Sequence, residues 1–133
     1  MSRHPPLFPA DLAVRIAADE LPRLRDDLER NGLACIDIDL GGCRDKAELM
    51  ARMASALRYP DPARFGDNWD ALTDALRDLD WWPADGYALV IDARGFAGHA
   101  HDAALVPGLV AALRDARAFW QDADTPFVPF YLQ

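Results

Sequence analysis

The sequence predicts an α/β layered fold in which a small, mainly parallel β-sheet is packed with helices. Segments with strand-like alternation are followed by segments with helical periodicity along most of the 133 residues, and this order is typical of parallel sheets. The run Tyr87-Ala88-Leu89-Val90-Ile91 is continuously apolar, as in a strand covered by helices on both faces. A chain of this length can form one domain with a substantial core.

The first 32 residues are predicted to form an N-terminal extension, and residues 33–133 the main domain. Residues 1–10 are rich in proline and are expected to be a flexible lead. Leu12, Val14 and Ile16 then alternate as in a short strand. A helix follows, with Asp19 as its cap, and Asn31-Gly32 ends it. This strand and helix could join the core or cover an edge of the sheet.

The main domain is predicted to begin with a strand over residues 33–40, ended by the turn Gly41-Gly42. Asp45 is expected to cap a helix that runs to about Leu57, and Tyr59-Pro60-Asp61-Pro62 to break it. In the strand, three apolar residues should face the core and two acidic residues should face outward: Ile36, Ile38 and Leu40 inward, Asp37 and Asp39 outward.

The next predicted helix, from about Asn68 to Leu79, has two distinct faces. Its apolar residues, spaced three and four apart, should be buried: Trp69, Leu72, Leu76 and Leu79. Asp70, Asp74 and Asp78, spaced four apart, share another face, and like charges at this spacing cost about 0.2–0.5 kcal/mol per pair. The helix macrodipole favours an acid only in the first turn, which accounts for Asp70 alone. The pattern fits a plain solvated face or a surface that meets a positively charged partner.

The C-terminal third is predicted to hold two helices and a strand. Residues 95–104 could form a short helix, and Pro107 starts or restarts a longer one with Leu109, Leu113, Ala116 and Trp120 on its inner face. Residues 127–132 form the last strand. Because Pro129 cannot donate a ladder hydrogen bond, this strand is expected at a sheet edge or with a bulge.

The composition predicts an acidic protein with no cofactor. Fourteen Lys and Arg residues against 22 Asp and Glu residues give a net charge of −8, which disfavours nucleic acid and anionic membranes and favours basic partners. The two cysteines, Cys35 and Cys43, have neither disulfide-framework nor zinc spacing. With no secretory leader or membrane-spanning run, a cytoplasmic location and free thiols are expected.

The segment Phe65-Gly66-Asp67-Asn68-Trp69-Asp70-Ala71-Leu72-Thr73-Asp74-Ala75-Leu76 resembles the signature of the barstar family of intracellular ribonuclease inhibitors. That signature is an aromatic residue, Gly, an acid, Asn, a large apolar residue, Asp-Ala-Leu, and an Asp four residues after the first. The element order from Leu33 onward is also similar to the family's, so the resemblance covers roughly the last hundred residues.

The resemblance implies a protein that is not an enzyme and that blocks the active site of a basic ribonuclease, possibly a toxin, one-to-one. Asp74 would occupy the phosphate site, while Asp70 and, on the last long helix, Asp115 would be further contacts. The loop before the helix would cover the active site. The expected partner-binding residues are Phe65, Gly66, Asp70, Thr73, Asp74, Arg77, Asp78 and Asp115. The free protein is expected to be a monomer.

Two residues depart from the family pattern. Arg64 and Thr73 stand where the family often has aromatic residues, and a positive charge at 64 fits a basic active site only if it turns away. These departures leave the partner's identity open. An acidic module that binds a basic protein other than a nuclease is the alternative.

Two further clusters suggest metal chemistry. His99, His101 and Asp102 could serve a metal-dependent hydrolase, although structural zinc normally needs four converging ligands. Asp37, Asp39 and Asp92 could meet at strand ends, as magnesium-binding carboxylates do. Solvent-exposed histidines and outward-facing strand carboxylates explain both clusters without a metal, so no metal site is predicted.

Overall fold

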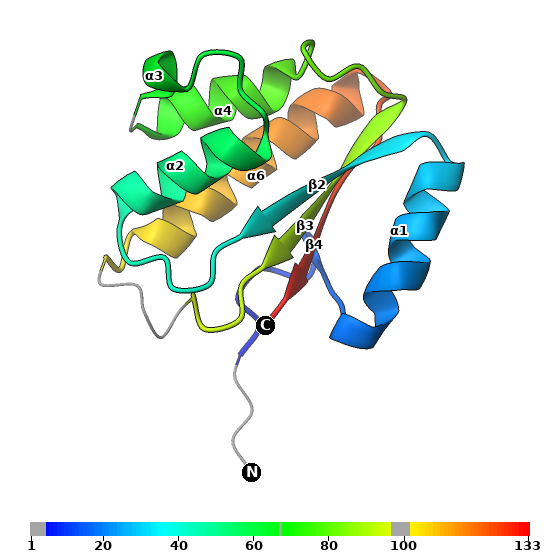
Figure 1. The fold of residues 1–133 in the computed structure, drawn as a ribbon, viewed down its shortest axis with the longest axis horizontal. Helices are drawn as coiled ribbons and strands as arrows, with labels where there is room; N and C mark the ends of the chain where they lie inside the picture. Colours follow the sequence, from blue (N-terminus) through cyan, green and yellow to red (C-terminus); the bar gives the residue numbers. More distant parts are fainter. Residues whose placement is uncertain (1–4, 67, 97–101) are drawn as a thin grey trace.

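The computed structural model describes residues 5–66, 68–96 and 102–133, and its centre is a four-stranded parallel sheet. The strands lie in the order β1-β4-β3-β2 (Figure 1). Ile36 is in register with Leu89, and Leu89 with Pro129. The α/β class predicted from the sequence is confirmed. The strand bounds are β1 Val14–Arg15, β2 Leu33–Asp39, β3 Gly86–Asp92 and β4 Phe127–Leu132.

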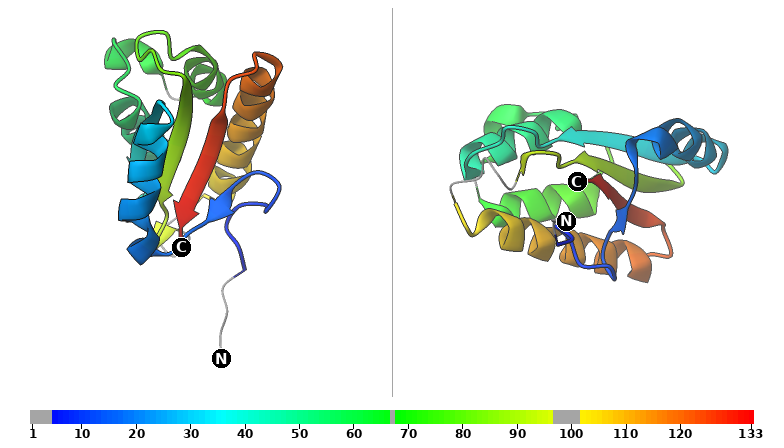
Figure 2. Two further views of the ribbon diagram at one scale, coloured as in Figure 1. Left: turned by 90° about the vertical axis from the view of Figure 1, so that its right-hand side faces the viewer. Right: turned by 90° about the horizontal axis from the view of Figure 1, so that it is seen from below.

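The helices cover the two faces of this sheet unequally. Helix α1 (Leu21–Arg30), preceded by the short helix η1 (Ala18–Glu20), lies apart from the other helices, across the sheet (Figure 1). Among the described residues, the helices on the other side are α2 Lys46–Ala56, α3 Pro62–Phe65, α4 Trp69–Asp78 and α6 Leu105–Asp122. Figure 2 shows α6 running along β4. The core is therefore thickest between the sheet and α2, α4 and α6.

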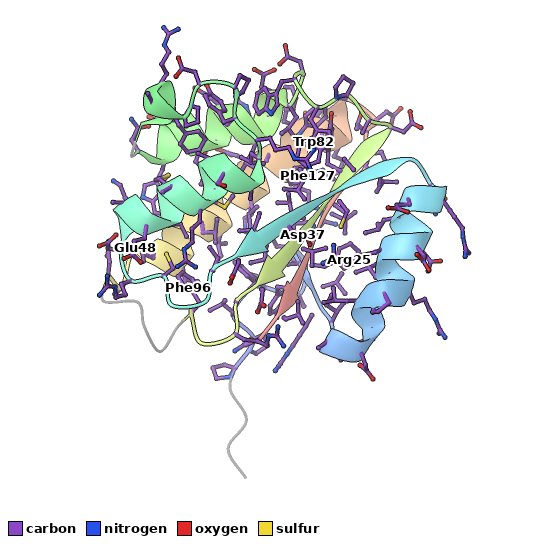
Figure 3. All side chains as sticks on the ribbon, in the orientation of Figure 1. Arg25, Asp37, Glu48, Trp82, Phe96 and Phe127 are labelled. Carbon is purple, nitrogen blue, oxygen red and sulfur yellow. The ribbon has the colours of Figure 1, made fainter. Side chains whose placement is uncertain are left out.

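Strand β2 confirms the predicted alternation. Ile36, Ile38 and Leu40 are buried, whereas Asp37 and Asp39 are exposed. On the exposed face, the Arg25 guanidinium of α1 lies 2.6 Å from the Asp37 carboxylate (Figure 3). This ion pair fixes α1 to β2 in a partly solvated place, where such a pair contributes about 0–1 kcal/mol.

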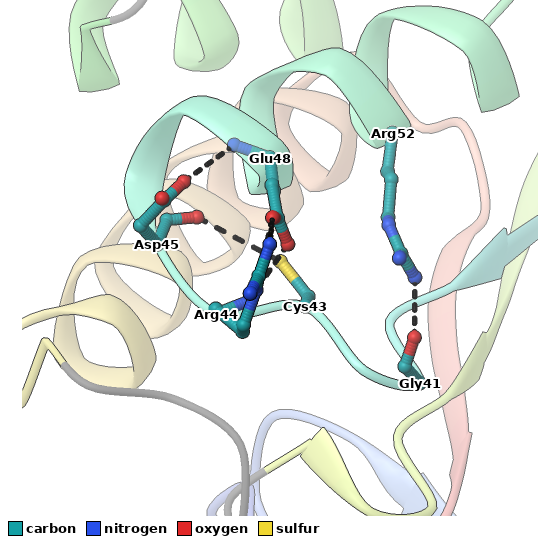
Figure 4. Close-up of polar contacts among 6 residues, drawn as sticks. All are labelled: Gly41, Cys43, Arg44, Asp45, Glu48 and Arg52. Carbon is teal, nitrogen blue, oxygen red and sulfur yellow. Dashed lines mark hydrogen bonds and ion pairs between the residues drawn. The ribbon is translucent and has the colours of Figure 1, made fainter.

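The predicted cap of α2 is also confirmed. The Asp45 carboxylate accepts a hydrogen bond from the backbone N–H of Glu48 at 2.9 Å (Figure 4). Arg52, further along the helix, donates to the carbonyl of Gly41 at 2.6 Å. Both ends of the β2–α2 connection are thus held by hydrogen bonds, which orients α2 on the sheet.

The described part of the N-terminal extension packs against the sheet. Phe8 is 1% exposed and makes an edge-to-face contact with Tyr131, with ring centroids 5.0 Å apart. The side chain of Gln133 accepts a hydrogen bond from the N–H of Leu7 at 2.8 Å. Phe8 is therefore part of the core and Leu7 packs against it, so this segment is held to the protein beside the last strand and is not a free lead. Strand β1 adds to the sheet beside β4.

Two local expectations need correction. Asp19 does not cap α1; it lies in η1, where Glu20 accepts from the N–H of Ala17 at 2.8 Å, and α1 begins at Leu21. The break after α2 also contains the short helix α3. Pro62 begins α3, at a helix position that proline tolerates because its missing N–H would be unpaired there anyway.

The position predicted for the last strand is wrong, because β4 lies between β3 and β1. The carbonyl of Tyr131 accepts a hydrogen bond from the backbone N–H of Ile16, which follows β1. In a strand, the backbone N–H and C=O groups of every second residue point to the same side. The nitrogen of Pro129 therefore also faces β1. Strand β1 pairs only with Phe130 and Tyr131, so the missing donor falls where β1 does not reach.

Helix α6 begins earlier than predicted, at Leu105, with Pro107 in its first turn, where the ring is tolerated. Its buried side includes the predicted Leu109, Leu113 and Ala116. The helix expected over residues 95–104 falls largely on residues 97–101, which lie outside the described residues.

Candidate functional site

Helix α4 separates the residues that fold the protein from those that face solvent. Its cap is Asn68, whose side-chain oxygen accepts from the N–H of Ala71 at 2.7 Å. Leu72 and Leu76 are 0% exposed, which anchors the helix in the core. Leu79 follows in the left-handed conformation, with φ of 54°, and ends the helix. The predicted bounds and the buried face of this helix are confirmed to within a residue.

Helix α4 lies beside α6 and is held to it at both ends. Near its start, Trp69 packs directly on Gly108, where the position of a Cβ would overlap the indole ring. Near its end, the indole nitrogen of Trp120 donates to the carbonyl of Leu76 at 2.8 Å. These contacts fix the helix as a rigid element rather than a mobile segment.

The outward face of α4 presents acids without internal partners. Asp70 and Asp74 are exposed, and neither forms an ion pair with any residue within the described ranges. The two carboxylates lie one turn apart and opposite the buried leucines. Their negative charge is therefore available to a partner.

The C-terminal end of α4 carries a second acidic pair. Burial, and then a hydrogen bond to Asp80, raises the pKa of Asp78 above its ordinary value of 3.8. The helix macrodipole also disfavours carboxylates at this end. Asp78 and Asp80 lie around a pocket of about 440 Å³ that also includes Tyr59 and Arg64.

Asp80→Asn should stabilise the protein near neutral pH but not in acid. Because folding raises the pKa of Asp78, this group's contribution to the free energy of unfolding is greatest below pH 3.8 and falls as the pH rises through the raised pKa. Removing the neighbouring charge should add about 0.3 kcal/mol at about pH 7 and almost nothing at about pH 3, after allowance for solvent screening.

Urea unfolding of both proteins at the two pH values measures this difference. Asp26→Asn, an exposed acid on α1, is the matched control for the loss of one negative charge. If Asp80→Asn raises the free energy of unfolding equally at both pH values, repulsion between Asp78 and Asp80 is not the source of the increase.

The loop before α4 has one inward and one outward residue. Phe65 is 3% exposed and packs edge-to-face on Tyr59, with centroids 5.1 Å apart. Gly66 is exposed, with φ of 79°, a conformation that glycine adopts without strain. Of the two predicted contact residues, Phe65 thus supports the loop from inside and Gly66 lies on its surface.

Arg64 and Thr73, the two residues that depart from the family pattern, each contact a neighbouring group of this chain. Arg64 is exposed, and its Nε lies 3.9 Å from the Asp61 carboxylate. The Thr73 hydroxyl donates to the carbonyl of Trp69 at 2.8 Å, so this short side chain is engaged with its own helix. Arg77 lies at the α6 side of α4, with its guanidinium carbon 5.6 Å from the centre of the Phe119 ring.

Asp115 lies on the side of α6 that faces α4. It is exposed and stands seven residues after Gly108 and four before Phe119, both of which contact α4. Residues at these spacings share a helix face. Asp115 is therefore exposed on the side of α6 that lies toward α4. The sequence pattern did not single out Phe119, which the structure leaves 43% exposed one turn after Asp115.

The other clusters do not form a metal site within the described ranges. His99 and His101 lie outside the described residues. Asp37 is paired with Arg25 and Asp92 with Arg94, and no group of three or more potential ligands converges in the described part of the chain. Burial raises the pKa of both free thiols, Cys35 and Cys43, which lowers their reactivity.

Comparison with known proteins gives one match. The family model described as Barstar (barnase inhibitor) matches residues 33–131, a span that contains the acidic helix, the preceding loop and Asp115. No curated protein and no solved structure matches the chain. Within the described ranges, no helix combines the length and apolar character needed to cross a membrane.

Proposed function

The chain belongs to the barstar family, whose model covers most of its length, and from this premise we propose that it inhibits a basic ribonuclease. The inhibitor would bind the enzyme one-to-one and place α4 and the preceding loop in the active site. The family's description names it as an inhibitor of barnase. The target of this chain is proposed here only as a basic ribonuclease or a ribonuclease toxin.

The observation that carries the proposal is the exposed carboxylate of Asp74, which has no ion-pair partner among the described residues and lies on a helix packed against the core. Ribonucleases stabilise an anionic transition state with cationic side chains in a cleft. A carboxylate in that cleft can replace a phosphate oxygen and accept charge-assisted hydrogen bonds. Asp74 is exposed on the outward face of α4, and Leu72 and Leu76 fix the helix beneath it, so binding would require little reordering.

The charges around Asp74 favour a basic partner. Asp70 and Asp78 lie one turn before and one turn after it on α4, and both are exposed. A net charge of −8 would steer a cationic enzyme toward the protein. A cationic partner would also relieve the repulsion between Asp78 and Asp80. The acidic surface therefore costs stability in the free protein and recovers it in the complex.

The remaining predicted residues have supporting roles. Gly66 would bring the loop backbone close to the enzyme, and the buried Phe65 would hold that loop in shape. Thr73, Arg77 and Asp78 would lie at the rim of the contact. Asp70 and Asp115 would pair with cationic groups beside the central one.

We place this activity in the cytoplasm of the producing cell, where an inhibitor protects the cell from its own ribonuclease. The chain would act as a stoichiometric immunity protein and not as an enzyme, without a cofactor and without binding nucleic acid or membranes. It would be a monomer when free. A gene for a small basic ribonuclease beside the gene for this chain would support the same role.

The test is a titration of the purified protein into ribonucleases. The set comprises barnase and each basic ribonuclease or ribonuclease toxin encoded by the source organism. We expect RNA cleavage by at least one enzyme to fall linearly to zero at one equivalent of inhibitor. If every enzyme in the set keeps full activity at excess inhibitor, the proposal is wrong.

Arg64 and Thr73 favour one alternative, an acidic module that binds a basic protein without nuclease activity. An exposed arginine at the edge of the acidic surface suits a partner with an acid of its own there. Affinity capture followed by identification of the bound protein and an RNA-cleavage assay separates the two functions. A basic partner that does not cleave RNA, bound in an Asp74-dependent way, would support the alternative.

A further inference from the structure

Phe119 on α6 is an unusual feature of the surface beside α4. Among the residues that the structure describes, the large hydrophobic side chains that are exposed are Val14, at 48%, and Phe119, at 43%. Isolated apolar residues on a surface are common, so exposure alone does not indicate a contact site. The inference rests on the charged residues next to Phe119.

Acidic residues flank Phe119 on its own helix face. Asp115 lies four residues before it and Asp122 three residues after it, so the three side chains share one side of α6, and all three are exposed. This side also faces α4, because Gly108 and Phe119 contact Trp69 and Arg77. The aromatic ring thus lies between two acidic residues of its own helix, with the Arg77 guanidinium of α4 against it.

The ring already attracts a guanidinium group. The guanidinium carbon of Arg77 lies 5.6 Å from the ring centre of Phe119, within the range of a cation–π contact. Trp120 meets the ring at 86°, with centroids 5.2 Å apart, which restricts its orientation. The ring is therefore held in place and presents an electron-rich surface between two carboxylates.

We propose that Phe119, with Asp115 and Asp122, binds an arginine or lysine side chain of the inhibited ribonuclease. The inference rests on the proposed function and extends its contact surface from α4 along α6. The cationic side chain would stack on the ring while one of the carboxylates pairs with its charge. Such a contact would help to decide which basic ribonuclease this chain recognises, because it requires a cation at one place on the enzyme.

Charge complementarity selects this occupant over an apolar one. An apolar side chain against Phe119 would bring low-dielectric surface up to Asp115 and Asp122 and desolvate their charges without compensation. A guanidinium or ammonium group pairs with one carboxylate and interacts with the ring.

The test compares variants at position 119 on the ribonuclease that the titration finds to be inhibited. Phe119→Ala and Phe119→Leu should each weaken binding about tenfold, since leucine keeps the apolar bulk but lacks the ring. Phe119→Trp should bind at least as tightly as the parent. Val14→Ala, at the exposed apolar residue on β1, is the control and should leave the dissociation constant unchanged.

The outcomes separate this inference from the proposed function. If Asp74→Ala abolishes inhibition but Phe119→Leu binds like the parent, the cation contact is wrong and the inhibitor function stands. If Phe119→Ala lowers the urea midpoint of unfolding without changing the dissociation constant, the residue has a structural role only, and the inference is again wrong. If no ribonuclease is bound, both proposals fail.

Discussion

Asp74→Ala is expected to weaken ribonuclease inhibition by at least about thirtyfold, the largest effect on binding of any single change in this chain. The loss follows because the cationic groups of the enzyme's phosphate site would be buried without a partner. Truncating one member of a buried, hydrogen-bonded charge pair costs about 2–5 kcal/mol, a range that draws on the barnase–barstar complex of this same family. The measurement is the inhibition constant, taken with the parent and the variant side by side.

Asp26→Ala on α1 is the matched control for Asp74→Ala. Both residues are exposed, and both changes make the net charge less negative by one, but Asp26 lies across the sheet from α4. We expect Asp26→Ala to change only the association rate, by a small factor. If the two variants lose inhibition equally, long-range attraction rather than a contact at α4 holds the enzyme.

Gly108→Ala is expected to destabilise the fold by about 1 kcal/mol, although the same change inside a helix normally stabilises by about that amount. The sign reverses because the new Cβ would overlap Cζ2 and Cε2 of Trp69, which forces the start of α4 away from α6. Inhibition should weaken as well, because Asp70 directly follows Trp69. Urea unfolding and the inhibition constant measure the two effects.

A double-mutant cycle with Trp69→Ala tests this explanation. Without the indole ring, Gly108→Ala has room and should stabilise the protein by about 1 kcal/mol, giving a coupling of about 2 kcal/mol between the two sites. A destabilisation of the same size in both backgrounds would mean that contact with Trp69 is not the cause.

The sequence was sufficient to predict those parts of the fold that depend on neighbours along the chain. The start of α4 near Asn68, its two faces and the alternation of β2 all follow from local spacing, and the structure confirms them. The packing of residues 5–10 was not predictable in this way. Phe8 is buried by Tyr131, at the opposite end of the chain, and no local pattern encodes a contact at that separation.

Pro129 shows how a sound local argument led to a wrong global position. Proline lacks an N–H, so an edge strand was expected. Strand β4 is nevertheless internal, because β1 pairs only with the two residues after Pro129. The length of a neighbouring strand is set by tertiary packing and cannot be read from the proline.

The candidate site was partly predictable. The structure exposes Asp70 and Asp74 on the outward face of α4, as the spacing led us to expect, and Asp115 is exposed on α6. The inward position of Phe65 was not evident, because its partner Tyr59 lies across a turn that the sequence marks only as a helix break. Phe119 was missed because its exposure depends on how α6 packs against α4.

Competition between the inhibitor and RNA tests the central claim most directly. The rate constant for the onset of inhibition would be measured after the enzyme is mixed with excess inhibitor at a range of RNA concentrations. If α4 and the preceding loop occupy the active site, bound RNA excludes the inhibitor, and this rate constant falls as RNA saturates the enzyme. A rate constant that does not depend on the RNA concentration would place the inhibitor away from the active site and contradict the account.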